Sequence, residues 1–269
     1  MADEPGFQLK RNVPERYEHY VAPIMAPFVT ALVDAVDLYP GAAVLDLACG
    51  TGFAARAAAA QVGPAGRVRG ADINEPMLRV AKAHHPRLYP DIEFTAAPAD
   101  KLPYPDASFD AVVCQQGAQF FPDLTAALTE TARVTRPHGR FAATVWAPRA
   151  LTSPYFAAQH EVLAEYGGPG PADSFAAAFA CTADRLTAAL RTAGFHEATA
   201  HEFTFGITLP PLAEFAPGHF SCLPWSQQIL DTRGPEALAA AAQALTTRLT
   251  AHADTTTFPF TATLATATR

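Results

Sequence analysis

The stretch Val44-Leu-Asp-Leu-Ala-Cys-Gly-Thr-Gly52 carries the strongest structural signal in the chain. Its apolar start predicts a short buried strand, and the Gly-x-Gly sequence then leads into an alanine-rich segment with helical character. Gly50 and Gly52 permit a tight turn and a close approach of the backbone to a ligand. We therefore expect a strand, a glycine turn and a helix in succession, with a ligand bound at the turn.

The charges around this turn favour a zwitterionic ligand. The free N–H groups at the start of the following helix attract an anionic group, whereas Asp46, at the end of the strand, attracts a cationic one. Asp72 ends the next predicted strand, 20 positions beyond Gly52. A βαβ nucleotide fold places there the carboxylate that accepts hydrogen bonds from ribose hydroxyls. Either aspartate alone is more often a loop carboxylate or a helix cap, but together with Gly-x-Gly they favour a nucleoside-containing ligand.

Short apolar runs alternate with helical segments over the first half of the chain. Strands are expected at 43–47, 68–71, 92–96, 109–114 and 140–146, with helices between them that include 124–134. Such alternation is typical of βαβ units and of a parallel sheet covered by helices on both faces.

The flanking regions are less regular. Residues 14–38 have apolar positions at helical spacing, which predicts one or two amphipathic helices. Beyond Pro148 we expect helices over 156–165, through Leu186 and Leu190, and over 236–250, with a loop at 167–171 and strands at 201–209 and 257–266. Residues 210–225 are rich in aromatic residues and prolines and are expected to be irregular.

Composition narrows the function classes. The chain of 269 residues has 19 basic and 26 acidic residues, so it lacks the electrostatic footprint of a nucleic-acid-binding protein. Its four cysteines are far apart and form no C-x-x-C pair. The acidic start Met1–Pro5 does not resemble a signal peptide, and no apolar stretch approaches the ~20 residues that span a bilayer. We expect a cytoplasmic protein with a small-molecule substrate and neither nucleic acid nor membrane as a partner, and the oligomeric state stays open.

Four motifs in register resemble class I S-adenosylmethionine-dependent methyltransferases. They are Val44–Gly52, the Ala71-Asp-Ile-Asn74 element, Leu102-Pro-Tyr-Pro-Asp-Ala-Ser-Phe-Asp110 and Arg133-Val-Thr-Arg-Pro-His-Gly-Arg140. The resemblance covers about residues 40–147 and is closest to the small-molecule branch, which includes the ubiquinone and menaquinone C-methyltransferases and many actinobacterial natural-product enzymes.

The resemblance implies a Rossmann-like α/β fold, whose seven-stranded, mostly parallel sheet has an antiparallel last strand and helices on both faces. It also implies S-adenosylmethionine as cofactor, with S-adenosylhomocysteine as product. Asp46, Ala48, Gly50 and Gly52 would surround the methionine moiety. Asp72 would bind the ribose hydroxyls, Ile73 and Met77 would flank the adenine, the Ala99 amide would contact the adenine edge, and Gln115 would face the cofactor.

One departure from the family concerns the adenine. The usual Gly-Asp-Ala element after the third strand is here Ala97-Pro-Ala99, so Pro98 replaces the acidic residue that contacts the adenine amine. Asp100 is a candidate substitute, although it could equally point to solvent.

Three regions follow from the resemblance: an N-terminal helical lid (1–40), the cofactor-binding core (41–147) and a C-terminal part (148–269) with a substrate-lid segment at about 210–250. The expected lid segments, Tyr17–Phe28 and Phe215–Trp225, are aromatic and apolar. They suggest a cover over an apolar or aromatic acceptor, although ordinary core packing explains most such residues. The candidate substrate contacts are Tyr17, Tyr20, Phe28, Phe220 and Trp225.

His19 and His219 lie in these two segments and are the candidate general bases for an oxygen or carbon acceptor. A lone histidine in a lid is more often structural or exposed. No carboxylate-and-histidine set has metal-ligand spacing, so we expect no metal.

The expected reaction is an in-line methyl transfer to a small, apolar or aromatic, natural-product-like acceptor of secondary metabolism. The alternatives are a non-methylating rearrangement or cyclisation on the same fold, and a peptide or protein methyltransferase. Gly50-Thr-Gly-Phe-Ala-Ala55 also fits the loose fingerprint of NAD(P)-dependent oxidoreductases. Asp46 brings negative charge toward the pyrophosphate position, however, and the chain has no Tyr-x-x-x-Lys pair.

Overall fold

The computed structural model describes residues 13–84, 90–251 and 256–269, and over these residues the chain forms a seven-stranded sheet. Its order is β3 (Ile92–Ala96), β2 (Arg67–Asp72), β1 (Ala43–Leu47), β4 (Phe109–Gln115), β5 (Thr135–Trp146), β7 (Thr257–Thr268) and β6 (His196–Thr208). The first five strands pair in parallel, and β7 is antiparallel to both of its neighbours. The predicted fold class is confirmed, including the antiparallel last strand.

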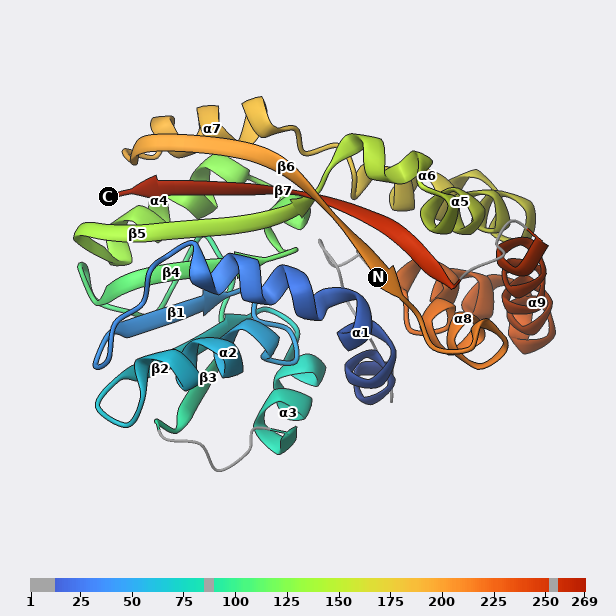
Figure 1. The fold of residues 1–269 in the computed structure, drawn as a ribbon, viewed down its shortest axis with the longest axis horizontal. Helices are drawn as coiled ribbons and strands as arrows, with labels where there is room; N and C mark the ends of the chain where they lie inside the picture. The colour runs from blue at the N-terminus through green and yellow to red at the C-terminus, as the bar shows by residue number, and fades with distance from the viewer. Residues whose placement is uncertain (1–12, 85–89, 252–255) are drawn as a thin grey trace.

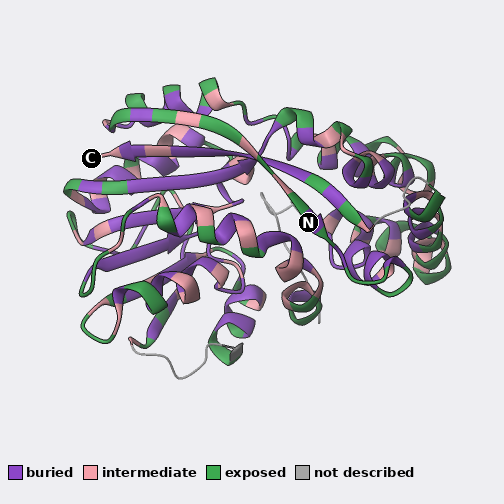
Figure 2. Cartoon of the chain, in the orientation of Figure 1, coloured by how far each residue is buried: buried purple, intermediate pink, exposed green. Residues whose placement is uncertain are grey.

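Helices cover both faces of this sheet (Figure 1). One face packs against the second half of α1 (Val13–Asp34), α2 (Phe53–Val62) and α3 (Glu75–His84), and the other against α4 (Leu124–Val134) and α7 (Ala183–Thr192). The buried face of α2 consists almost entirely of alanines, which lets the helix lie close to the strands. Figure 2 shows the resulting purple interior along the strands, with exposed positions on the outer helix faces.

A further group of helices lies beyond the carboxyl ends of the parallel strands: α5 (Pro154–Gly167), α6 (Pro169–Ala177), α8 (Leu212–Phe220) and α9 (Pro224–Ala251) (Figure 1). Strands β6 and β7 reach this group because they extend beyond the end of β5. Trp146, the last residue of β5, pairs with Ala262, so residues 257–261 of β7 extend past it and pair only with β6. A second, aromatic-rich core forms between these strand ends and the helices.

Local sequence explains where most elements begin and end. Every residue of β1 is buried, as expected for a central strand covered on both faces. Asn74 caps α3 by accepting a hydrogen bond from the Met77 N–H, and Asp123 caps α4 in the same way through the Ala126 N–H. Gly63, with φ of 64°, ends α2. The predicted boundaries of β1, β3 and α4 are confirmed to the residue.

The helices beyond Pro148 differ from the predictions. Residues 167–171 do not form the expected loop. The helical structure is interrupted only at Gly168 (φ 84°), and α6 begins directly afterwards with Pro169 at its first position. The region 210–225, expected to be irregular, forms α8 and the start of α9 despite Pro217 inside α8. Burial of Phe215 and Phe220 in the aromatic core stabilises that helix against its proline. The helix expected from residue 236 follows a kink at Gly234 within α9.

Candidate active site

A pocket of about 290 Å³ lies at the carboxyl ends of the parallel strands. Its walls come from the loops after β1, β2, β3 and β4, from α1, and from the helix group beyond the sheet. We call the part lined by the loops after β1, β2 and β3 the glycine end. The part lined by Trp146, Phe156, Phe175, Phe179 and Trp225 is the aromatic end. This is the place where open α/β sheets bind ligands.

The glycine turn has a backbone conformation that residues with a Cβ atom rarely adopt. Gly50 and Gly52 have φ values of 52° and 85°, in the left-handed region. A Cβ atom on Gly52 would lie 3.0 Å from the Phe94 ring, and one on Gly50 would lie 3.2 Å from the Met77 Cε atom. The sequence therefore needs glycine at both positions to form the turn and to leave the pocket open beside it.

Asp46 lies beneath this turn rather than in the pocket wall. It is 1% exposed, and its Oδ2 accepts a 2.8 Å hydrogen bond from the Ala55 N–H at the start of α2. Its Oδ1 atom is buried and has no hydrogen-bond partner within the described residues. Burial raises the pKa of this carboxyl to about 8.

Asp72 connects the ends of β1 and β2. Its Oδ2 accepts a 2.8 Å hydrogen bond from the Gly50 N–H, and its Oδ1 accepts a 2.7 Å bond from the Asn74 N–H. Burial raises the pKa of Asp72, and hydrogen bonds from the Asn74, Gly50 and Ile73 N–H groups oppose that effect. Each oxygen retains a second lone pair, and the carboxylate lines the pocket, so it can accept hydrogen bonds from ligand hydroxyls.

An apolar slot lies next to Asp72. Ile73 is 50% exposed, which is unusual for a large apolar side chain here, and it lines the pocket together with Met77. Ala99 lines the same region, and Pro98 and Asp100 are exposed at its edge. A flat ring would fit against these apolar side chains.

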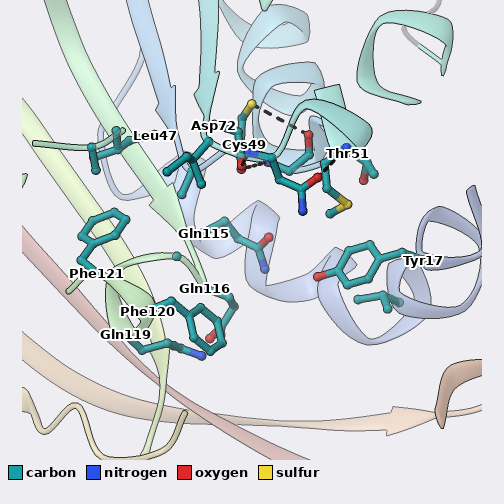
Figure 3. A pocket seen from close by; sticks show the side chains of 18 of the residues that line it. Tyr17, Leu47, Cys49, Thr51, Asp72, Gln115, Gln116, Gln119, Phe120 and Phe121 are labelled. Carbon is teal, nitrogen blue, oxygen red and sulfur yellow. Dashed lines mark hydrogen bonds between the residues drawn. The ribbon is translucent and has the colours of Figure 1, made fainter. Parts of the chain in front are cut away.

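Gln115 ends β4 in the middle of the pocket. Figure 3 shows its side chain between the loop that carries Cys49 and the Tyr17 ring of α1. Its Nε2 atom lies 3.0 Å from the Met25 Sδ atom. Burial, and secondarily the charge of Asp72, raise the pKa of Tyr17, so its phenol stays neutral.

The aromatic end is built from edge-to-face ring contacts. The Trp146 ring lies 5.0 Å from Phe156, and Phe175 lies 4.9 Å from Trp225 and 5.2 Å from Phe179. These rings come from β5, α5, α6 and α9 and from the segment after α6, so the wall depends on the packing of segments far apart in the sequence. Such a surface suits an apolar or aromatic ligand.

His219 of α8 belongs to this end of the pocket. Its Nδ1 atom lies 3.0 Å from the Tyr155 hydroxyl oxygen and 3.2 Å from Gln159 Nε2. Burial lowers its pKa to about 3, so the ring is neutral at pH 7. His19, the other expected base, is exposed on α1 and lines a separate shallow hollow with Glu15 and Glu18. Its position therefore argues against a role as a base in the main pocket.

Most of the expected site residues meet in this one pocket. Its lining includes Ala48, Gly50, Asp72, Ile73, Met77, Ala99, Asp100, Gln115, Tyr17, Trp225 and His219. Asp46, beneath the glycine turn, and Gly52, at the end of that turn, are not part of the lining. The expected substrate contacts Tyr20, Phe28 and Phe220 instead pack in the aromatic core, where the Tyr20 ring fills the space that a Cβ atom on Gly218 would need.

Sequence reasoning missed several lining residues, among them Thr51, Gln116, Gln119, Phe156 and Gln159. The polar pair Gln115-Gln116 directly after a buried strand was a usable signal. Phe156 and Gln159 lie on the inward face of α5. The sequence does not indicate which face of this helix points inward, because both faces of α5 contain apolar residues. Among the described residues no group of three His, Cys, Asp or Glu side chains could hold a metal ion, and no described helix is long and apolar enough to cross a bilayer.

Comparison with known proteins supports this view of the central region. Residues 45–143 match the model of a methyltransferase domain family. The nocamycin O-methyltransferase of Saccharothrix syringae is 39% identical over 119 residues, which are 44% of this chain and 42% of the relative. A ubiquinone/menaquinone biosynthesis C-methyltransferase of Hahella chejuensis is 44% identical over 40% of this chain and 44% of its own. The matches thus span less than half of each relative, and over them the predicted resemblance is confirmed.

Solved structures extend the likeness of fold to nearly the whole chain. A phosphoethanolamine N-methyltransferase of Haemonchus contortus, in complex with S-adenosylhomocysteine, superposes with a TM-score of 0.60 at 17% identity over 95% of this chain and 56% of its own. The [4+2]-cyclase SpnF superposes with a TM-score of 0.56 at 19% identity over 100% of this chain and 87% of its own. At these identities the likeness is one of fold alone.

Proposed function

Because residues 45–143 match the methyltransferase domain family, we propose that the protein transfers a methyl group from S-adenosylmethionine to a small, apolar or aromatic acceptor. The observation that carries this proposal is the continuity of the pocket. One end has the glycine turn and Asp72, and the other is walled by aromatic rings. A cofactor at the glycine end would therefore face an apolar space for a second molecule.

The residues at the glycine end fit the cofactor's chemistry. Asp46 has a buried oxygen without a partner among the described residues, which suits the ammonium of the methionine moiety. Asp72 would accept hydrogen bonds from the ribose hydroxyls. Ile73 and Met77 would flank the adenine, with Ala99 and Asp100 at its edge. Ala48, Gly50 and Gly52 would give the backbone its close approach, and Gln115 would face the reacting centre.

The task of the protein in this reaction is alignment. When bound, S-adenosylmethionine supplies an electrophilic methyl group on a sulfonium. In an in-line displacement the acceptor atom bonds to the methyl carbon as the carbon–sulfur bond breaks, which leaves S-adenosylhomocysteine. The aromatic end would hold the acceptor atom about 3 Å from the methyl carbon, and such positioning can lower the barrier by several kcal/mol.

The cover of the pocket would keep water away while charge redistributes. Tyr17 of α1 and Trp225 of α9 line the pocket from opposite segments of the chain. The Tyr20 ring of α1 also packs on Phe215 of α8, 6.3 Å between centroids. We propose that residues 13–40 and about 210–250 form the lid over a core of residues 41–147; residues 1–12 of the expected N-terminal segment lie outside the described residues.

Product mass tests the proposal and separates it from a rearrangement. The protein is incubated with S-adenosylmethionine that carries a deuterated methyl group and with a panel of phenols, enols and hydroxyquinones. Methyl transfer predicts a product heavier by one deuterated methyl group together with S-adenosylhomocysteine, and a lower yield of both with Asp72→Ala when the cofactor is limiting. A product of unchanged mass that still requires the bound cofactor would contradict methyl transfer and favour an isomerisation or cyclisation.

A further inference from the structure

Buried amide groups without partners line the aromatic end of the pocket. Gln159 Oε1, Gln119 Nε2 and both amide atoms of Gln116 are buried and have no hydrogen-bond partner within the described residues. All three glutamines line the pocket, and Figure 3 shows Gln116 and Gln119 beside Phe120. Buried polar groups in folded proteins are nearly always satisfied. Their concentration here therefore points to a ligand that supplies the missing hydrogen bonds.

Hydrogen bonds to the protein fix which end of two of these amides is free. Gln119 Oε1 accepts a 3.0 Å bond from the Trp146 N–H, so its NH₂ group is left to donate. Gln159 Nε2 lies 3.2 Å from His219 Nδ1, so its carbonyl oxygen is left to accept. These two amides thus offer one donor and one acceptor, and both amide atoms of Gln116 are also without a partner within the described residues.

His219 adds a further donor. An amide nitrogen only donates, so His219 Nδ1 must accept from Gln159, and it can accept from the Tyr155 hydroxyl as well. In the neutral ring the proton then resides on Nε2. His219 lines the pocket and its Nδ1 is already engaged by Tyr155 and Gln159, so Nε2 is the ring nitrogen left to donate to a ligand. An Nε2 atom that holds its proton donates a hydrogen bond and cannot act as a base.

The charges of the pocket limit the ligand further. None of the lining residues that the structure describes is Lys or Arg. The acidic ones are Asp72, which ends β2, Asp100 in the loop after β3, and Asp123, which caps α4. A carboxylate or phosphate at the aromatic end would be buried without a counter-charge, which is unfavourable.

We infer that the aromatic end binds an uncharged acceptor that carries a carbonyl oxygen and a phenol or enol hydroxyl. Gln119 and His219 donate to the carbonyl oxygen, and Gln159 accepts from the hydroxyl. This inference rests on the proposed function and specifies its substrate class. Burial keeps His219 neutral at pH 7 and lowers its pKa to about 3, so the hydroxyl proton passes to water as the oxygen bonds to the methyl carbon and the carbon–sulfur bond breaks. A phenol or enol gives up this proton more readily than an alcohol does.

Matched naphthalenes test the inference by calorimetry, with the protein saturated with S-adenosylhomocysteine. The probes are 6-acetyl-2-naphthol, which has both oxygen groups, 2-acetylnaphthalene, which lacks the hydroxyl, and 6-hydroxy-2-naphthoate, which replaces the ketone by a carboxylate. We expect the first to bind at least about tenfold more tightly than either of the others, the effect of one hydrogen bond or one uncompensated charge. Equal or tighter binding of the carboxylate, or no binding of any probe, would overturn the inference.

Variants assign the individual contacts. Gln159→Leu should weaken the binding of 6-acetyl-2-naphthol about tenfold, because this probe has the hydroxyl. It should change the affinity for 2-acetylnaphthalene, which lacks the hydroxyl, by no more than about twofold. His219→Asn keeps an acceptor near Tyr155 but has no atom at the Nε2 position, so it should weaken the binding of both ketone probes. His219→Gln restores a donor there and should recover most of the affinity. The control Gln228→Leu, exposed on α9, should change nothing.

Two outcomes keep this inference distinct from the proposed function. If wild-type protein fails to bind S-adenosylhomocysteine, the proposed function fails before any probe is added. If the cofactor product binds and the variants keep their melting temperatures, a loss of ketone affinity that is equal for His219→Gln and His219→Asn would overturn the donor role of His219.

Discussion

The Gly50 N–H donates a 2.8 Å hydrogen bond to Asp72 Oδ2, and this bond joins the carboxyl ends of β1 and β2. It holds the glycine turn against the residue expected to bind a ribose. The same carboxylate also accepts a bond from the Asn74 N–H and so fixes the start of α3. Asp72 therefore shapes the binding loop as well as lining it.

Asp72→Ala should weaken binding of S-adenosylhomocysteine by about 2 kcal/mol or more, roughly thirtyfold, through loss of charge-assisted hydrogen bonds. Calorimetric titration measures the change. The matched control is Asp184→Ala, because Asp184 is exposed in the first turn of α7. An unchanged affinity in Asp72→Ala would remove Asp72 from the cofactor site.

The charged form of Asp46 should destabilise the ligand-free protein and favour binding of the cofactor. Its pKa in the folded protein, about 8, is above the ordinary value of 3.8. The folded state thus binds the proton more tightly than the unfolded state does, and the contribution of Asp46 to stability is lost as pH rises from about 4 to about 8. Asp46→Asn should therefore raise the melting temperature of the ligand-free protein relative to wild type, by more at pH 8 than at pH 5.

The same variant should lose affinity for S-adenosylhomocysteine at pH 8, because a neutral amide at this position cannot form an ion pair with the ammonium group. Asp184→Asn serves as the control in both melting and titration experiments. A melting-temperature difference that does not grow between pH 5 and pH 8 would contradict the raised pKa, and a retained affinity would contradict the ammonium contact.

Gly52→Ala should destabilise the protein and disturb the turn. The left-handed φ of 85° and the Phe94 ring 3.0 Å from the added Cβ both oppose the substitution. We expect a loss on the order of 2 kcal/mol, or a fall of about 5 °C in melting temperature. Gly170→Ala, in α6 with no atom within 4 Å of its Cβ position, should be neutral or slightly stabilising. Equal effects of the two substitutions would refute the steric account.

Pro98→Asp should tighten binding of S-adenosylhomocysteine about fivefold, roughly 1 kcal/mol, by restoring an acceptor for the adenine amine. Pro98 lines the pocket edge next to Ala99, so a side chain there can reach a ligand at Ile73. Titration of the variant beside wild type measures the gain. An unchanged affinity would mean that Asp100 or the backbone already provides this contact.

The sequence predicts the βαβ half of the fold almost completely, because its signals are local. The apolar run at 43–47, the cap at Asn74 and the glycine turn each act within a few residues. Helices α6 and α8 escape prediction because proline and glycine interrupt their sequences, and burial against the aromatic core stabilises them. That burial depends on β6 and β7 extending past β5, which no local pattern reveals.

The two ends of the pocket also differ in how far the sequence predicts them. The glycine end follows from residues near one another in sequence, so Asp46, Gly50 and Asp72 can be predicted together. The aromatic end joins Gln119, Gln159 and His219 from three separate segments. Its hydrogen bonds depend on how α5 and α8 pack, so the sequence alone suggests a base at His219, whereas the structure gives this histidine fixed partners.

Calorimetric titration of the purified protein with S-adenosylhomocysteine, with NADH as the parallel control, shows which cofactor the glycine turn binds. We expect micromolar binding of S-adenosylhomocysteine and no binding of NADH. Binding of NADH alone, or of neither ligand, would contradict the assignment of the glycine turn, Asp46 and Asp72 to S-adenosylmethionine.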